Sequence, residues 1–361
     1  MKKQLFFIAA AALGLASCSQ DETIEVNTSE AISFRTFVNA QTRADDIDNG
    51  KLTQFNVTAR YESNNYFDDV TFTKGENETF NSATNYYWPA NALNFYAYSP
   101  IGNTQVTRTD YRTFTVKPSD NTADQVDLVY ANTNDKTKAT SGANGVVLNF
   151  RHTGSKIVFQ VKNTAANMKF EVTGWKVGYL DNEGTFTYAD ANTDEKNATQ
   201  LAYTDWSENT TYSAENTYTN TLTAAKSVAA STSDAALLDG EMILIPQKPT
   251  KATAYAAATA DSKVNGSYVA LEIKIMNNDN AGTVIQEKTW AIWPVAFSWE
   301  PGKKYTYTID LAGGGYYEKN IADSDEKLDP ILKDAVIKFV NVTVDEWQDV
   351  TPATDVTMPG N

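Results

Sequence analysis

The sequence predicts an all-β fold, with two β-sandwich domains in tandem. Its 361 residues are more than one sandwich commonly needs, and they include 19 Tyr, 16 Phe and 7 Trp, residue types that favour strands. Short clusters of Asn, Asp and Gly recur along the chain, as expected for turns between strands. No long segment has the period of an amphipathic helix, and the Ala-rich residues 223–240 would form a short helix at most.

Strict alternation of apolar and polar residues marks several strands. In residues 55–61, one face carries Phe55, Val57, Ala59 and Tyr61, and the polar residues between them share the other. The same pattern occurs in residues 270–276 and 304–311. Alternation with a period of two predicts a strand with one face in a core and the other in water.

The alternation slips once, within residues 169–180. Phe170 and Val172 fall on one face, whereas Trp175 and Val177 fall on the other. A bulge at Gly174 would return both pairs to the core, because a bulge adds one residue to a strand.

A polar loop separates the two predicted domains. Residues 132–145 are rich in Asn, Thr and Gly, and a strongly apolar strand follows them. We therefore predict an N-terminal domain over residues 31–145 and a C-terminal domain over residues 146–350, followed by a tail, 351–361.

The N-terminus carries the parts of an export signal. Two lysines precede an apolar run, residues 5–16, which is too short to cross a bilayer because a spanning helix needs about 20 apolar residues. Residues 15–18, Leu-Ala-Ser-Cys, resemble a bacterial lipobox, in which the cysteine is acylated, with palmitate among the expected chains. We expect a signal peptide at 1–17 and attachment of Cys18 to outer-membrane lipid. The alternative is an ordinary signal peptide with an incidental cysteine.

The chain is acidic, with 45 Asp and Glu against 30 Lys and Arg. Removal of residues 1–17 would take away two lysines and no acid, leaving 28 basic against 45 acidic side chains. This charge repels nucleic acid, so we expect no nucleic-acid partner. Residues 18–30 are polar and acidic, and we expect them to form a tether.

The composition argues against an enzyme and against a metal site. Cys18 and His152 are the only cysteine and histidine, so neither a disulfide nor a tetrahedral zinc site is expected. His152 lies on an alternating strand, where a hydrogen-bonded structural role is expected. The oxygen-rich residues 45–50 and 277–282 do not match the spacing of an EF-hand. We expect no catalysis, no cofactor and no metal.

Six segments together resemble the fimbrillin family of Bacteroidetes, the Mfa-like and FimA-like pilus subunits. In chain order they are residues 42–44, 86–100, 148–161, 240–247, 299–311 and 342–347. The resemblance implies two transthyretin-like β-sandwich domains. It also implies a surface-exposed lipoprotein that serves cell adhesion as a subunit of a fimbrium, or pilus, with other fimbrial subunits as partners.

The resemblance further implies a mechanism of assembly. A protease cuts the precursor after an arginine, the N-terminal strand leaves, and a strand from another subunit replaces it by donor-strand exchange. Ile32, Phe34 and Val38 would form the removable plug strand. The cut would fall between Arg43 and Ala44, because Arg43 lies in a polar stretch just after that strand.

Two alternatives remain open at this stage. The plug strand could be permanent, which would leave a monomeric lipoprotein or a terminal subunit. The chain could instead be a monomeric glycan-binding surface lipoprotein that uses the aromatic residues of 202–218. The tail after Trp347 is short and weakly apolar, so it would be a weak donor strand, whereas Trp347 itself is expected in the core.

Overall fold

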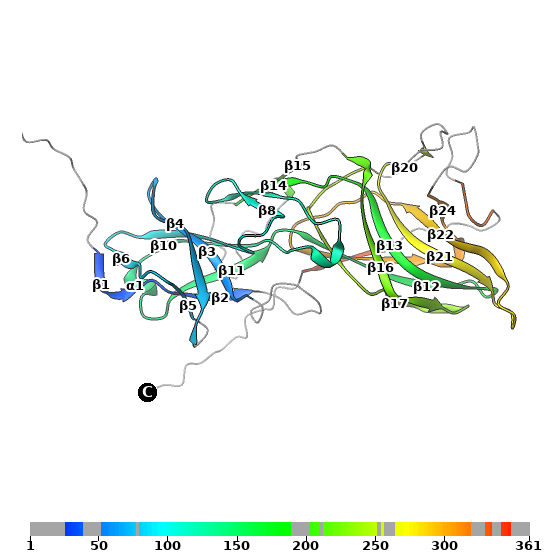
Figure 1. Cartoon of the computed structure of the whole chain (residues 1–361), viewed down its shortest axis with the longest axis horizontal. Coiled ribbons are helices and arrows are strands. Elements are labelled where there is room, and N and C mark those ends of the chain that lie inside the picture. Colours follow the sequence, from blue (N-terminus) through cyan, green and yellow to red (C-terminus); the bar gives the residue numbers. More distant parts are fainter. Residues whose placement is uncertain are drawn as a thin grey trace, which may run out of the picture.

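The computed structural model describes residues 26–38, 52–76, 79–188, 203–208, 212–250, 254–255, 264–318, 329–333 and 341–347 (Figure 1). Regular structure in these ranges is almost entirely strand, which confirms the predicted all-β class. The helices of the same ranges are short: α1 (Lys138–Ser141) and the 3₁₀ turns η2 (Thr122–Asp124), η3 (Tyr203–Asp205) and η4 (Leu311–Gly313). None of the described helices has the length and apolar content needed to cross a membrane.

Seven strands near the N-terminus form a closed barrel in the order β10-β11-β2-β5-β4-β3-β7. Their bounds are β2 (Phe34–Val38), β3 (Gln54–Tyr61), β4 (Asn64–Lys74), β5 (Thr79–Ser82), β7 (Leu93–Ser99), β10 (Val129–Lys136) and β11 (Val146–His152). The predicted inward face of residues 55–61 is confirmed, because Phe55, Val57 and Ala59 are fully buried. Tyr61, on the same face, is half-buried and packs against the same core. The interior is aromatic, with Phe34, Phe72, Phe80, Phe95 and Phe150 also fully or almost fully buried.

The C-terminal strands form two sheets with one core between them. One sheet has the order β17-β12-β23-β25, with β18 beside β12, and the other has the order β16-β13-β21-β22-β24. Their bounds are β12 (Ser155–Asn163), β13 (Met168–Leu180), β16 (Ser213–Val228), β17 (Thr232–Leu237), β18 (Met242–Leu244), β21 (Tyr268–Asn277), β22 (Val284–Pro294), β23 (Lys303–Asp310), β24 (Tyr316–Tyr317) and β25 (Asn341–Glu346). The two sheets meet where Phe159 of β12 packs on Trp175 of β13, with ring centroids 4.6 Å apart. A separate short pair, β19 (Ala254–Tyr255) and β20 (Val264–Asn265), lies beside this body.

The bulge predicted at Gly174 is confirmed. The register of β13 shifts between Val172 and Gly174 against both of its neighbours, β16 and β21. Phe170, Val172, Trp175 and Val177 are consequently all buried in the same core. The bulge therefore resolves the conflict in the sequence between the two apolar faces.

A small third sheet joins the barrel to the C-terminal sheets. Its order is β15-β14-β9-β8, with bounds β8 (Val106–Arg108), β9 (Thr113–Val116), β14 (Gly184–Thr187) and β15 (Trp206–Glu208). The pairing of β9 with β14 joins segments from the two halves of the chain, and Figure 1 shows β8, β14 and β15 between the two larger bodies. Its side chains pack on Tyr96 and Tyr130, on the outer surface of the barrel.

Two predicted segment limits differ from the observed pairing. β11 pairs with β10 and β2, so the change from barrel to C-terminal sheet comes between His152 and Ser155, later than the limit expected after Gly145. Residues 26–30, expected to belong to the tether, are part of β1 (Val26–Ala31), which pairs with β6 (Tyr87–Pro89). Residues 26–30 lack the apolar alternation that predicts a strand. They can still pair with β6, because the pairing uses main-chain hydrogen bonds, which do not require apolar side chains.

Candidate functional site: the first strand of the barrel

The predicted site residues divide into two groups. Cys18, Arg43 and Ala44 lie outside the described residues. Phe34 and Val38 are the first and last residues of β2, and Ile32 lies in the short link between β1 (Val26–Ala31) and β2. Phe34 and Val38 therefore share one strand, and Ile32 directly precedes it.

β2 is an internal strand of the barrel. On one side it runs parallel to β11, in a continuous register from Phe34 opposite Val146 to Val38 opposite Phe150. On the other side it runs antiparallel to β5, where the pairing covers Phe34 with Phe80 and Arg35 with Thr79. Because β2 lies between β11 and β5, the barrel is closed only while β2 is in place.

Phe34 is the centre of the packing around β2. Its side chain is 0 % exposed, and its ring meets Phe72 and Phe95 edge to face, with centroids 4.6 Å and 5.2 Å apart. Ile32, 2 % exposed, enters the same core, and its main-chain N–H donates to the carbonyl of Tyr86 at 2.7 Å. Arg35, by contrast, points to solvent. This alternation is that of an ordinary barrel strand.

A glycine turn holds the start of β2 against β11. Gly145 has a φ of +76°, and a Cβ at this position would lie 3.2 Å from the carbonyl oxygen of Ser33. That same oxygen accepts a hydrogen bond from the N–H of Val146 at 2.8 Å. Only glycine combines this backbone conformation with so close an approach.

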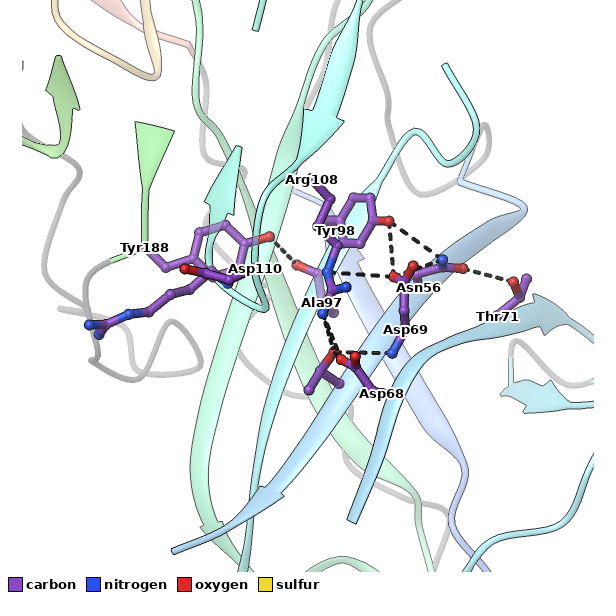
Figure 2. A network of polar contacts seen from close by, with 11 residues as sticks. Asn56, Asp68, Asp69, Thr71, Ala97, Tyr98, Arg108, Asp110 and Tyr188 are labelled. Atoms are coloured by element: carbon purple, nitrogen blue, oxygen red, sulfur yellow. Dashed lines mark hydrogen bonds and ion pairs between the residues drawn. The ribbon is translucent and has the colours of Figure 1, made fainter. Parts of the chain in front are cut away.

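A polar network covers the outer face of the barrel, where the sequence predicts solvent. Asn56 and Thr58 on β3 are buried, although their alternation with apolar residues indicated an exposed face. Figure 2 shows Arg108 of β8 beside Asp68 and Asp69 of β4, and Tyr98 of β7 hydrogen-bonded to Asp69. Arg108 also donates to Thr58 Oγ1 at 3.2 Å. The β8–β9 hairpin comes from a distant part of the sequence, so the alternation within β3 could not reveal this cover.

A bulge allows two adjacent carboxylates to face the same network. Asp69 has a φ of +53°, and the register of β3 against β4 shifts between Val57 and Ala59. Arg108 Nη2 lies 2.6 Å from Asp68 Oδ1, whereas Asp69 Oδ1 accepts from Tyr98 Oη at 3.0 Å. In a regular strand these neighbours would point to opposite faces.

The charges and hydrogen bonds of this network are satisfied within the protein, which indicates a structural role. Burial raises the pKa of the Tyr98 hydroxyl to about 12, and the charge of Asp69 and the hydrogen bond to it add to this effect. Asn56 Nδ2 donates to Asp69 at 3.0 Å, and Thr71 Oγ1 donates to Asn56 at 2.7 Å. Both carboxylates are thus engaged by protein donors, and the described residues contain no group of three or more acidic, His or Cys side chains that could hold a metal ion.

The single histidine is the last residue of β11. His152, 2 % exposed, is hydrogen-bonded through Nδ1 to Asp127 Oδ2 at 2.6 Å. The ring of Trp347 stacks on it at 4.1 Å with an interplanar angle of 6°, and Trp347 is buried, as the sequence predicts. The stacked rings join the end of β11 to the residue that follows β25. Burial, stacking and the hydrogen bond to Asp127 indicate a structural role for His152.

Two further sequence candidates have structural roles. Trp206 and Tyr218, in the aromatic stretch considered for glycan binding, are both buried, and Trp206 Nε1 donates to the carbonyl of Thr153 at 2.9 Å. The expectation of an exposed aromatic surface is therefore wrong for these two residues. In residues 277–282, Asp279 Oδ1 accepts from the N–H groups of Gly282 and Thr283, which lowers the pKa of its carboxyl and closes a hairpin turn.

Comparison with known proteins finds a matching family and similar solved structures. The sequence matches the family described as fimbrillin-like over residues 38–347. A fimbrial protein from Bacteroides vulgatus has a similar structure, with a TM-score of 0.55, 14 % identity, and coverage of 88 % of this chain and all of that one. A candidate cell adhesion protein from Bacteroides uniformis is 16 % identical over 88 % of this chain and 99 % of its own, with a TM-score of 0.44.

Among curated proteins, none matches this sequence. The family match nevertheless spans the barrel from the end of β2, the joining sheet and the C-terminal sheets up to Trp347. The chain belongs to the fimbrillin-like family.

Proposed function

We propose that the chain is the precursor of a surface-exposed fimbrial subunit that serves cell adhesion. Its family membership supports this role, and the fimbrial protein from Bacteroides vulgatus shares the fold. The observation that carries the mechanism is the position of β2. This strand is an integral part of the barrel, and yet it belongs to the N-terminal segment that precedes Arg43.

The precursor would first be anchored through its N-terminus. The signal peptide, residues 1–17, is removed, and acylation of Cys18 attaches the chain to the outer membrane. Several acyl chains give a stable anchor, since each buried CH₂ contributes about 0.8 kcal/mol and a single chain binds only weakly. Residues between Cys18 and β1 would then hold the barrel near the membrane surface.

Cleavage between Arg43 and Ala44 would separate β1 and β2 from the rest of the chain, because both strands precede the cut. Their loss would leave β11 and β5 without their shared neighbour. It would also leave the space of Phe34 empty among Phe72, Phe80 and Phe95. Unpaired strand edges beside an apolar groove strongly favour the addition of another strand.

The incoming strand would come from a second subunit. To replace β2 it must run parallel to β11 and place a large apolar side chain where Phe34 lies now. Burial of such a side chain contributes about 1.5–3 kcal/mol, and the main-chain ladder adds to it. The tail 351–361 carries few apolar residues and two prolines, so it is a weak candidate for this strand.

The test is to determine the N-terminus and the state of assembly of protein shed from the native cell surface. We expect a chain that begins at Ala44 and runs as a ladder of multimers on a non-boiled gel. Arg43→Ala should leave a chain that begins at acylated Cys18 and stays monomeric. Arg35→Ala removes the other nearby arginine and should be processed normally, because Arg35 lies within β2.

Either of two results would contradict the proposal. One is a wild-type chain that keeps Cys18 and remains monomeric, which would indicate a permanent plug strand. The other is normal assembly of the Arg43→Ala variant, which would place the cut elsewhere.

A further inference from the structure

Two guanidinium groups flank one tyrosine ring on the outer surface of the barrel. Arg60 is near the end of β3, and Tyr111 and Arg112 lie in the β8–β9 hairpin. The Cζ atom of Arg60 is 4.2 Å from the centroid of the Tyr111 ring, and that of Arg112 is 5.7 Å away. All three side chains are partly exposed. We call them the Arg60–Tyr111–Arg112 cluster.

Neither arginine has an acidic partner among the described residues, although the chain has 45 acidic residues. Arg60 donates to neutral oxygens, the side-chain amide of Asn65 and the carbonyl of Ser63, the latter at 2.6 Å. The polar contacts of Arg112 are those of its main chain, to Asp110 and Tyr188. Their neighbour Arg108 behaves differently, because it is paired with Asp68 and Asp69.

The local structure fixes the Arg60 guanidinium and the main chain of Arg112 before any ligand arrives. The contacts of Arg60 with Asn65 and Ser63 span the β3–β4 turn. The carboxylate of Asp110 accepts from the Arg112 N–H at 2.8 Å and shapes the β8–β9 turn. Tyr111 is held edge to face by the buried Tyr96, with centroids 4.8 Å apart. A preorganised arginine loses less freedom when it binds, so more of the interaction energy appears as affinity.

The free donors define the chemistry of the ligand. A guanidinium has five N–H donors in a planar fork, and two of those of Arg60 are used within the protein. Such forks bind carboxylates and other oxyanions with paired hydrogen bonds. The chain as a whole repels a polyanion, however, because its net charge of −15 acts on every charge of the ligand. A ligand with one carboxylate and an otherwise neutral body fits both conditions.

We propose that the Arg60–Tyr111–Arg112 cluster binds the carboxylate of an acidic saccharide, such as a terminal sialic or uronic acid on a surface glycan. The partly exposed tyrosine offers a rigid ring with an apolar body beside the two cations. The choice of a glycan as the source of the carboxylate rests on the proposed adhesive role, whereas the anion chemistry rests on the contacts of the cluster alone.

The experiment is calorimetric titration of the chain without residues 1–17, which keeps β2 in the barrel. The ligands are 3′-sialyllactose and lactose, each at low and at physiological ionic strength. We expect saturable binding of sialyllactose, and binding of lactose at least about tenfold weaker, because lactose lacks the carboxylate. Arg60→Gln and Arg112→Gln should each weaken the binding of sialyllactose about tenfold, and higher salt should weaken it further. Arg112→Lys should restore only part of the loss, because lysine keeps the charge without the fork.

Lys226→Gln is the matched control. It removes one positive charge from β16, outside the cluster, and should leave binding unchanged. Equal affinity for lactose and sialyllactose, unchanged binding in both arginine variants, or no saturable binding would overturn the proposal. Equal competition by inorganic sulfate would also overturn it, by reducing the cluster to a general anion site. The Arg60 and Arg112 variants should still form the ladder of multimers on a non-boiled gel, because the cluster lies outside β2 and its neighbours β11 and β5. Loss of glycan binding can therefore be distinguished from loss of assembly.

Discussion

Phe34 couples β2 to the interior of the barrel. Its ring contacts Phe72 and Phe95 edge to face, and it has no exposed surface. A cavity left at such a site cannot collapse easily, because the surrounding aromatic rings belong to different strands of a closed sheet. The stability of the barrel should therefore depend strongly on this one side chain.

We expect Phe34→Ala to lower the free energy of unfolding by about 3–5 kcal/mol. The measurement is chemical denaturation, with Arg43→Ala as the background so that proteolysis cannot change the result. Arg35→Ala is the control in the same strand, and it should change stability by no more than about 0.5 kcal/mol because its side chain is exposed. A loss below about 1 kcal/mol for Phe34→Ala would show that the barrel tolerates an empty position in β2.

Tyr98 should make stability depend on pH in the alkaline range. Burial, together with Asp69, raises the pKa of its hydroxyl to about 12 in the folded chain, whereas the unfolded value is about 10. Between these values the unfolded chain has lost the proton and the folded chain has kept it, so stability falls as pH rises from about 10 towards 12. Below about 10 both states are protonated and this contribution is fully present.

The measurement is the free energy of unfolding as a function of pH in the wild-type chain and in Tyr98→Phe. The variant cannot ionise at this position, so its stability should fall less steeply between about pH 10 and 12. Asp69→Asn should lower the pKa of Tyr98, because it removes the negative charge beside the hydroxyl. Identical slopes in the wild-type chain and Tyr98→Phe would exclude this contribution.

At the scale of strands, sequence patterns within one strand predicted its inward face and its bulge. The alternation in residues 55–61 gave the inward face of β3, and the slip near Gly174 gave the bulge in β13. The outward face of β3 was predicted wrongly, because Asn56 and Thr58 lie under a hairpin that follows about fifty residues later in the chain. Which distant strand covers a face depends on topology, and no periodicity within one strand records it.

Long-range pairing also explains the other differences in strand placement. Residues 146–152 are as apolar as a strand of either domain, so their composition could not show that they pair with β10 and β2. The burial of Ile32 and Phe34 could be predicted because their alternation is local. The Arg60–Tyr111–Arg112 cluster could not, since it joins two hairpins, and the only sequence signal for it was an arginine beside a tyrosine.

At the scale of the molecule, the joining sheet determines how the halves behave together. β9 and β14 exchange main-chain hydrogen bonds across the two halves, and Tyr188 Oη donates to the carbonyl of Ala97 on the barrel at 2.9 Å. Phe186 of β14 lies in the same cluster, with its ring centroid 5.2 Å from that of Tyr130 on β10 and 5.4 Å from that of Trp206. A subunit that transmits force along a fimbrium benefits from such a joint, because the two bodies cannot separate without breaking a sheet.

We therefore expect the wild-type chain to unfold in a single calorimetric transition, with equal calorimetric and van't Hoff enthalpies. Phe186→Ala should remove about 3–5 kcal/mol from the joint and split the transition in two, because the barrel and the C-terminal sheets would then melt separately. Phe297→Ala is the matched control: Phe297 is equally buried, but it packs on Trp299 within the C-terminal core. It should lower the melting temperature of the C-terminal sheets without weakening the joining sheet. Two transitions in the wild-type chain, or the same profile for both variants, would show that the joining sheet does not couple the halves.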